Sequence, residues 1–277
     1  MRVCQRMNNY KIDKSKNIGN VIFVVEGGRP DTGGTELRLL KKIFADILGY
    51  EVQELRRGSD EFIGYGSNAQ CRVFALNLPK NQLTEMTEEA LDELYRRLNV
   101  EFNIKPEDCP IFYLYDRDYL SYKRNELRRK YVMKYTDPYG DEEGNQGQLL
   151  LSYPAVESYL LSCIQDNVFL QSYFLGKDLK PEVAKTGFSE EDIETDEHLI
   201  HAVTEMNRGL EAFNLGEYDL DNLAPTLLGV YDYQQEKQKT DATFSLLSLI
   251  SMALLELGII TEYEDSDIDD NANDSVL

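Results

Sequence analysis

Blocks of apolar residues alternate along the first half of the chain with segments of helical periodicity. Apolar runs of strand length lie at 21–25, 111–115 and 148–152. Between the first two runs, apolar residues recur at helical spacing over Thr35–Leu48, and a second such pattern begins at Thr87. Because strands alternate with helices, the pattern predicts an α/β fold with a parallel sheet flanked by helices on both faces.

The rest of the chain gives weaker patterns, and beyond Pro154 most of them are helical. Two further strands are expected at 51–55 and 72–78, with a glycine-containing polar segment between them. The remaining expected helices are 121–134, 154–164, 196–213 and 242–259. The last of these is apolar almost throughout, which is typical of a buried helix in a core or an interface.

These patterns divide the chain into three expected regions. Residues 1–165 form the sheet domain, and residues 166–261 form a mostly helical domain. Residues 262–277 hold seven acids and no lysine or arginine, which is typical of an extended, disordered tail. We therefore expect one larger domain, one smaller domain and an acidic tail.

The net charge of −21 is distributed unevenly. Residues 1–150 hold 24 acidic and 23 basic side chains, whereas residues 151–277 hold 26 acidic and 6 basic side chains. The first half is therefore able to present a local basic patch to phosphate groups, while the second half repels them. The acidic half fits either a docking surface for a basic partner or simply a soluble acidic domain.

Composition excludes several classes of protein. Hydrophobic residues make up 42% of the chain, so most of it can bury enough apolar surface to fold. The four cysteines show no C-x-x-C spacing and indicate neither a zinc site nor a disulfide framework. No apolar run is long enough to span a bilayer, and the N-terminal residues lack the apolar segment of a secretion signal. We expect a soluble cytoplasmic protein without a membrane partner.

Acidic residues stand at or near the ends of the three apolar runs. Glu26 closes the first run, Asp116 and Asp118 follow the second, and Glu36 lies in the helix after the first. Glu157 comes shortly after the third run. Because the carboxyl ends of parallel strands lie at one edge of a sheet, we expect these acids to converge there. An all-carboxylate set suits Mg²⁺ or Mn²⁺ and does not suit zinc.

Three motifs, in this order, resemble the TOPRIM domain, the metal-binding fold of topoisomerases, primases and the nucleases of the OLD and RloB-like groups. The first is Glu26-Gly27 with Thr35-Glu36 at the start of a helix, which is similar to the family's E-G-x-T-E pattern. The second is Asp116-x-Asp118. The third runs from Ser152 to Glu157 with the S-x-P-x-x-E spacing of RloB-like proteins. The resemblance covers residues 20 to 165.

The chain departs from the family pattern between Gly28 and Thr35, where the connection is longer than the compact motif allows. The second acid is therefore either Asp31 or Glu36. We favour Glu36 because it stands beside Thr35 at the start of the expected helix, whereas Asp31 after Pro30 suits a turn.

The resemblance implies a TOPRIM-type endonuclease that hydrolyses phosphodiester bonds with one or two Mg²⁺ or Mn²⁺ ions. Under it, Glu26 is the candidate general acid or base, and Asp116 and Asp118 are the first metal ligands. Glu157 and Glu36 complete or orient the metal shell. The expected catalytic set is thus Glu26, Glu36, Asp116, Asp118 and Glu157, and the same set without Glu36 is the expected metal-binding set.

Small TOPRIM nucleases of this kind act in bacterial anti-phage systems beside an ABC-type ATPase. The resemblance therefore implies a toxic effector controlled by a partner ATPase, with tRNA or other RNA favoured as substrate and DNA left open. This chain has no G-x-x-x-x-G-K-[ST] motif, so any ATPase function must come from another chain. A homodimer is a further expectation.

A run of basic residues follows the Asp116-x-Asp118 motif. Its members are Lys123, Arg124, Arg128, Arg129, Lys130 and Lys134. Two interpretations of this run stay open: contact with phosphates near the expected metal edge, and an ordinary solvated helix face.

An alternative hypothesis for the whole protein is a TOPRIM-shaped binding or regulatory subunit without catalysis. The intact set of acids favours the enzyme.

Overall fold

The computed structural model describes residues 9–26, 34–55, 61–67, 71–78, 88–117, 122–140, 146–220 and 223–263. Within these residues, eight strands form one mixed sheet, and helices cover both of its faces. The strand order is β11-β8-β6-β2-β5-β4-β3, with β7 pairing to β8 beside this path. The expected α/β fold, with a mostly parallel sheet between helices, is therefore confirmed.

Four parallel strands form the centre of the sheet. They are β2 (Asn20–Glu26), β5 (Arg72–Leu78), β6 (Ile111–Asp116) and β8 (Gly147–Tyr153). β2 lies between β5 and β6, and β6 lies beside β8. Both faces of these strands are covered, which explains why they are continuous apolar runs instead of alternating patterns.

The two edges of the sheet are antiparallel. On one side lie β4 (Phe62–Tyr65) and β3 (Glu51–Glu54). On the other side, β7 (Thr136–Asp137) pairs with the beginning of β8 and β11 (Leu247–Ser248) with its end. The sequence missed β4, because its four residues include a glycine and follow a polar segment. Burial of Phe62 and Ile63 against the core favours the strand there.

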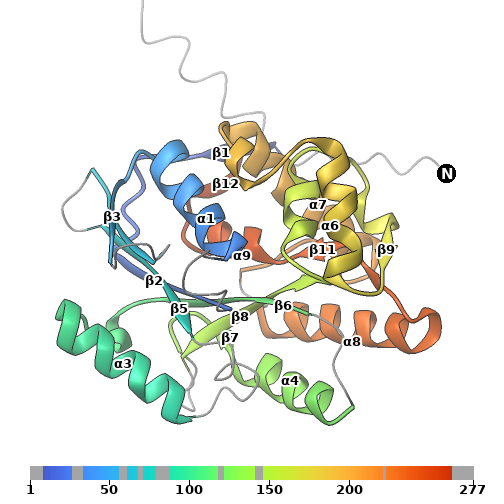
Figure 1. Ribbon diagram of the computed structural model, residues 1–277, viewed down its shortest axis with the longest axis horizontal. Helices are drawn as coiled ribbons and strands as arrows, with labels where there is room; N and C mark the ends of the chain where they lie inside the picture. The colour runs from blue at the N-terminus through green and yellow to red at the C-terminus, as the bar shows by residue number, and fades with distance from the viewer. Residues whose placement is uncertain are drawn as a thin grey trace, which may run out of the picture.

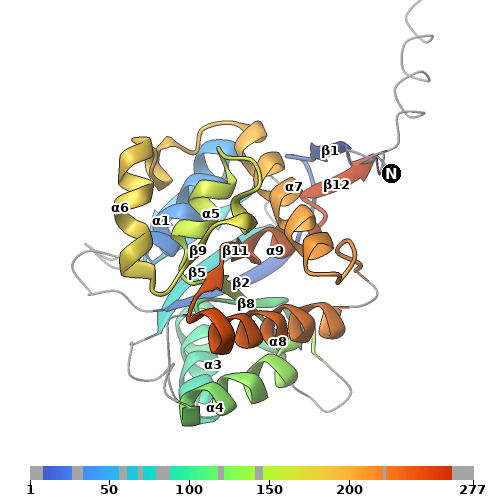
Figure 2. The same cartoon turned by 90° about the vertical axis from the view of Figure 1, so that its right-hand side faces the viewer.

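The helices form two layers (Figures 1 and 2). One layer contains α1 (Thr35–Lys41), α5 (Glu157–Ser162), α6 (Gly176–Thr186), α7 (Asp196–Ala212) and α9 (Ile250–Glu256). The other contains α3 (Glu88–Phe102), α4 (Tyr122–Lys134) and α8 (Leu223–Asp241). α1 continues into a π-helical segment, η1 (Lys42–Ile47). The expected helices 35–48, 121–134 and 196–213 are confirmed, α3 lies where a helix was expected after Thr87, and α5 occupies part of the expected helix 154–164. α6 and α8 were not predicted from the sequence.

Short elements complete the described chain. Three are 3-10 turns: η2 (Pro106–Asp108), η3 (Val168–Leu170) and η4 (Glu190–Asp192). Two strand pairs lie outside the main sheet: β1 (Asn9–Ile12) with β12 (Ile260–Tyr263), and β9 (Ser172–Tyr173) with β10 (Phe244–Ser245). The start of the acidic tail, expected at residue 262, falls inside β12, and residues 264–277 lie outside the described part.

The expected helix 242–259 is wrong over its first half. β10 and β11 occupy residues 244–248, and only α9 is helical. A fully buried apolar segment shows no polar face, so periodicity cannot distinguish strand from helix there. Through β11 and α8, the C-terminal part packs directly on β8 and α4. The division at residue 165 stays a prediction.

Candidate functional site

The register of the parallel strands brings the candidate acids to one end of the sheet. Val25 pairs with Leu114, and Asp116 pairs with Ser152. Glu26 and Asp116 therefore close two adjacent strands at neighbouring levels. Asp116 is the first partly exposed residue after five buried ones in β6, so its carboxylate lies where the strand leaves the covered part of the sheet. The side chain of Glu26 lies outside the described part of the structure.

Asp116 contacts the beginning of α5. Its Oδ1 accepts a hydrogen bond from the backbone N–H of Val156 at 2.7 Å. Val156 immediately precedes Glu157, the first residue of α5. The structure thus brings the second and third acidic motifs together, 40 residues apart in the sequence. An acidic group at this helix end also stabilises the unbonded N–H groups of the first turn.

Glu157 is buried, with 7% of its surface exposed. Its Oε1 lies 3.6 Å from Nζ of Lys180, an exposed lysine of α6. The salt bridge is long, and the lysine is two-thirds exposed, so solvent screens much of the attraction. Glu157 therefore has a neighbouring cation within the protein, which no local sequence pattern indicates.

Glu36 is the other buried candidate. It lies in the first turn of α1, with 7% of its surface exposed, and α1 packs against β2 and β5. Its position at the start of the helix that follows β2 is the one the sequence predicted. The alternative second acid, Asp31, lies outside the described residues, as does Asp118.

The expected metal site stays a prediction. Among the described residues, no group of three His, Cys, Asp or Glu side chains is close enough to hold a metal ion. Asp116, Glu157 and Glu36 are among these residues, whereas Asp118 and the side chain of Glu26 lie outside them. The chemistry of the described acids fits Mg²⁺ or Mn²⁺, because a ligating carboxylate is typically also hydrogen-bonded, as Asp116 is to Val156.

Arg117, between the two aspartates of the second motif, is buried with 1% of its surface exposed. Its N–H donates to the carbonyl oxygen of Ser152 at 2.8 Å, which extends the β6–β8 ladder. Its guanidinium donates to Gln235 and lies 5.3 Å from the ring centres of Tyr231 and Phe244. Burial lowers the pKa of Arg117 from its ordinary value. Arg117 therefore connects the end of β6 to α8 and β10.

Part of the basic run lies beside Asp116. The Nη1 of Arg128 donates to the carbonyl oxygen of Asp116 at 3.3 Å. Arg129 forms two 3.1 Å bonds to Asp232 of α8, and Lys130 is exposed. The side chains of Lys123 and Arg124 lie outside the described part. Lys134 is half-buried, with its Nζ 5.2 Å from the ring centre of Tyr135. The four described members of the run thus lie at the strand end, in a surface ion pair, facing solvent and against an aromatic ring.

Ser152 has a structural contact. Its Oγ lies 2.8 Å from Oγ of Ser248, across the pairing of β8 with β11, and the residue is buried. The hydroxyl of Ser152 therefore links β8 to β11. The sequence motif gave no indication of this contact.

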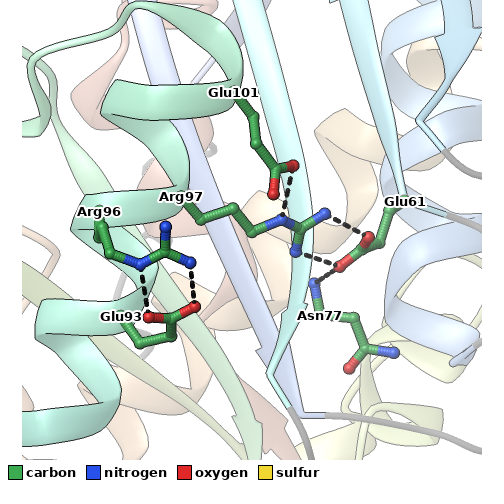
Figure 3. Close-up of polar contacts among 6 residues, drawn as sticks. All are labelled: Glu61, Asn77, Glu93, Arg96, Arg97 and Glu101. Atoms are coloured by element: carbon green, nitrogen blue, oxygen red, sulfur yellow. Dashed lines mark hydrogen bonds and ion pairs between the residues drawn. The ribbon is translucent and has the colours of Figure 1, made fainter.

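A second carboxylate cluster, at the end of β5, was not found from the sequence. Glu61 accepts two hydrogen bonds from Arg97, at 3.0 and 2.7 Å, and one from the backbone N–H of Asn77 at 2.9 Å (Figure 3). The side chains of Glu61 and Arg97 are 6% and 12% exposed. Arg97 also contacts Glu101, whereas its neighbour Arg96 pairs with Glu93 on the surface. This buried cluster joins β4, β5 and α3, and the arginine balances the charge of Glu61.

No family model, curated protein or solved structure matches this chain. None of the helices in the described ranges combines the length and apolar character that crossing a membrane requires.

Proposed function

We propose that the protein is a metal-dependent nuclease of the TOPRIM kind that hydrolyses phosphodiester bonds. The observation that carries the proposal is the 2.7 Å bond from Val156 N–H to Asp116, because it joins the second acidic motif to the helix that begins with Glu157. The parallel register supports it further by ending β2 at Glu26, on the strand next to β6.

The residues at this strand end have distinct proposed roles. Asp116, Asp118, Glu26 and Glu157 bind Mg²⁺ or Mn²⁺, and Glu36 orients the acids around it. When bound, the metal neutralises charge on the scissile phosphate and activates water. Glu26 holds or releases a proton as general acid or base. The Val156 N–H fixes one oxygen of Asp116, so that its carboxylate keeps one orientation.

Arg128 and Lys130 are the proposed phosphate contacts among the described basic residues. Arg128 is favoured because its guanidinium already lies at the main chain of Asp116. Lys123 and Arg124 belong to the same proposal from sequence alone. Arg129 is a weaker member, since both of its bonds go to Asp232.

The substrate and partners extend this proposal. In size and in the order of its motifs, the chain resembles AriB, the TOPRIM effector of the PARIS anti-phage system. That resemblance favours tRNA over other RNA and DNA as the substrate. It also favours a partner ABC-type ATPase that holds the nuclease inactive. The corresponding role is abortive infection, in the cytoplasm.

A second candidate function is a TOPRIM-shaped binding or regulatory subunit without catalysis. Two contacts favour it: Asp116 holds the start of α5, and Glu157 lies near Lys180. Both acids therefore stabilise the fold in ways that need no metal. The net charge of the C-terminal half also fits a docking surface for a basic partner.

Nuclease assays on the purified chain distinguish the two functions. tRNA, other RNA and DNA are incubated with Mg²⁺ or Mn²⁺, with Asp116→Asn and Glu157→Gln as test variants. Asp241→Asn is the matched control, because it removes a carboxylate from an exposed surface pair with Lys237. We expect cleavage that a chelator abolishes. Both test variants should cleave about a hundredfold more slowly, which is equivalent to roughly 3 kcal/mol of transition-state stabilisation. The control should cleave as the unmodified protein does.

Undiminished cleavage by Asp116→Asn would contradict the nuclease proposal. Absence of cleavage in every preparation, including one with a co-expressed ATPase, would favour the regulatory subunit. Retention of a cooperative unfolding transition in the variants is checked by circular dichroism.

A further inference from the structure

A cavity of about 450 Å³ lies at the opposite end of the sheet from the candidate nuclease site. Asn17 and Ile18, just before β2, and Tyr139, before β8, line it. The other walls come from β1, α7, α9 and β12, which lie together in Figure 2. Its volume is in the range of pockets that hold small molecules, about 300–1,000 Å³.

A chain of hydrogen bonds crosses the floor of this cavity. The Tyr218 hydroxyl donates to Oε1 of Glu256, and the Tyr218 N–H donates to Oδ1 of Asn207 at 3.1 Å. Asn207 in turn donates to the hydroxyl of Tyr10. Gln148, fully buried at the start of β8, lies 3.5 Å from the same carboxylate oxygen of Glu256. Side chains from distant parts of the sequence thus fix the orientation of Glu256.

The cavity has an acidic wall and several aromatic ones. Glu256 and Glu262 line it, and Lys16 is its basic residue. The Lys16 side chain runs along the wall at Gly258, where a Cβ would lie 3.0 Å from its Cε. Tyr10, Tyr139 and Tyr218 provide the aromatic surface, and Tyr139 is 61% exposed at the rim. A carboxylate and aromatic rings that line the same cavity both attract ammonium groups.

Burial of the acid supports the same chemistry. Desolvation raises the pKa of Glu256, the hydrogen bonds from Tyr218 and Gln148 lower it in part, and the charge of Asp137 raises it. A cation placed beside Glu256 would counter the effects of burial and of Asp137, because it favours the charged carboxylate. A bare divalent metal fits less well, since it prefers several charged oxygens and no group of three metal-binding side chains occurs in the described ranges.

We propose that this cavity binds a small organic amine in its protonated form, with the ammonium group at Glu256 and the alkyl chain against the tyrosine rings. The site is independent of the proposed nuclease function, because it lies at the amino ends of β2 and β8 and shares no residue with the acidic strand end. Lys16, the like charge at this site, weakens the binding of a cation and limits its affinity.

Calorimetric titration with three matched probes tests the ligand class. Putrescine, 1,4-butanediol and adipate share a four-carbon chain and end in ammonium, hydroxyl and carboxylate groups. We expect putrescine to bind with one site per chain and the other two probes not to bind. No binding of putrescine, or equal or tighter binding of either other probe, overturns the proposal.

Three variants then place the probe in the cavity. Glu256→Gln keeps an acceptor for Tyr218 but removes the charge, and we expect it to weaken putrescine binding about tenfold or more. Lys16→Ala removes the like charge, and we expect binding to tighten about two- to threefold. Glu236→Gln removes one exposed carboxylate of α8 and should change nothing, which controls for attraction to the acidic surface as a whole.

Unchanged binding in Glu256→Gln, or weaker binding in Lys16→Ala, contradicts the proposal. If Glu256→Gln fails to fold, the opposite effect of Lys16→Ala still decides the outcome. Asp116→Asn should bind putrescine as the unmodified protein does, so failure of this site and failure of the nuclease proposal are distinguishable.

Discussion

Glu61 and Asp116 lie near the carboxyl ends of parallel strands on either side of β2, yet the protein holds them in different ways. Arg97 balances Glu61 with two short hydrogen bonds, and the Asn77 N–H adds a third. Asp116 receives a backbone N–H from the start of α5. Burial of a carboxylate at this end of the sheet is therefore not enough to mark a metal ligand, because an arginine already balances the charge of Glu61.

The largest expected effect on stability comes from breaking the Glu61–Arg97 pair. Arg97→Met leaves Glu61 buried without its arginine, and we expect a loss of about 3–5 kcal/mol in the free energy of unfolding. The matched control is Arg96→Met on the same helix, which breaks the exposed pair with Glu93 and should cost about 0–1 kcal/mol. Urea denaturation measures both. Equal costs for the two variants would show that burial does not strengthen the dependence on Arg97.

Metal-dependent stabilisation sharpens the comparison further. If Asp116 binds Mg²⁺, the metal at a hundred times its dissociation constant raises the free energy of unfolding by about 2.7 kcal/mol. Asp116→Asn should lose this increase, and Glu61→Gln should keep it despite its lower starting stability. Thermal unfolding with and without Mg²⁺ measures this increase. If Asp116→Asn keeps the increase and Glu61→Gln loses it, the metal binds at Glu61 and the proposed site is wrong.

Without metal, Asp116→Asn should have a smaller effect than Arg97→Met. The amide oxygen of asparagine still accepts from Val156, so only the charge of the acceptor is lost, at a cost of about 1 kcal/mol. Urea denaturation in the presence of a chelator measures this cost. A loss as large as that of Arg97→Met would identify Asp116 as chiefly a structural residue and favour the regulatory subunit.

The smallest effect concerns Glu256, a third carboxylate, whose pKa is raised chiefly by burial. Because the pKa is raised in the folded protein, the folded state binds this proton more tightly than the unfolded state does. Its contribution to stability is full below the ordinary carboxyl pKa and is lost as pH rises through the raised pKa. Glu256→Gln should therefore lose less stability than the unmodified protein as the pH rises above about 4, as measured by thermal unfolding. An identical pH dependence would contradict this assignment.

The sequence predicted the centre of the fold better than its edges. The strands at β2, β6 and β8 are long apolar runs whose burial on both faces leaves a strong signal. β4 and β11 are short, and their pairing partners determine them more than their own residues do. The four-residue β4 was therefore not predicted, and β11 was predicted as part of a helix.

Local motifs singled out the acids near the strand ends, and the structure places Asp116 beside the helix that begins with Glu157. Convergence of the whole set stays a prediction. The motifs did not predict the long-range partners of the charged side chains. Arg117 contacts residues more than 110 positions away, and Glu61 pairs with a residue 36 positions away. Contacts of this kind depend on how separate elements pack, which no local pattern records.

The edges of the main sheet bear on whether the sheet can extend into another molecule. β7 and β11 cover the outer side of β8, whereas β3 leaves its outer side open among the described strands. β3 carries Glu51 and Glu54, both exposed, in a strand of four residues. A second copy adding itself there by antiparallel pairing would bring like charges together on a short ladder, which disfavours both aggregation and a continuous intermolecular sheet. The open strand of the main sheet is thus a poor place for another chain to pair.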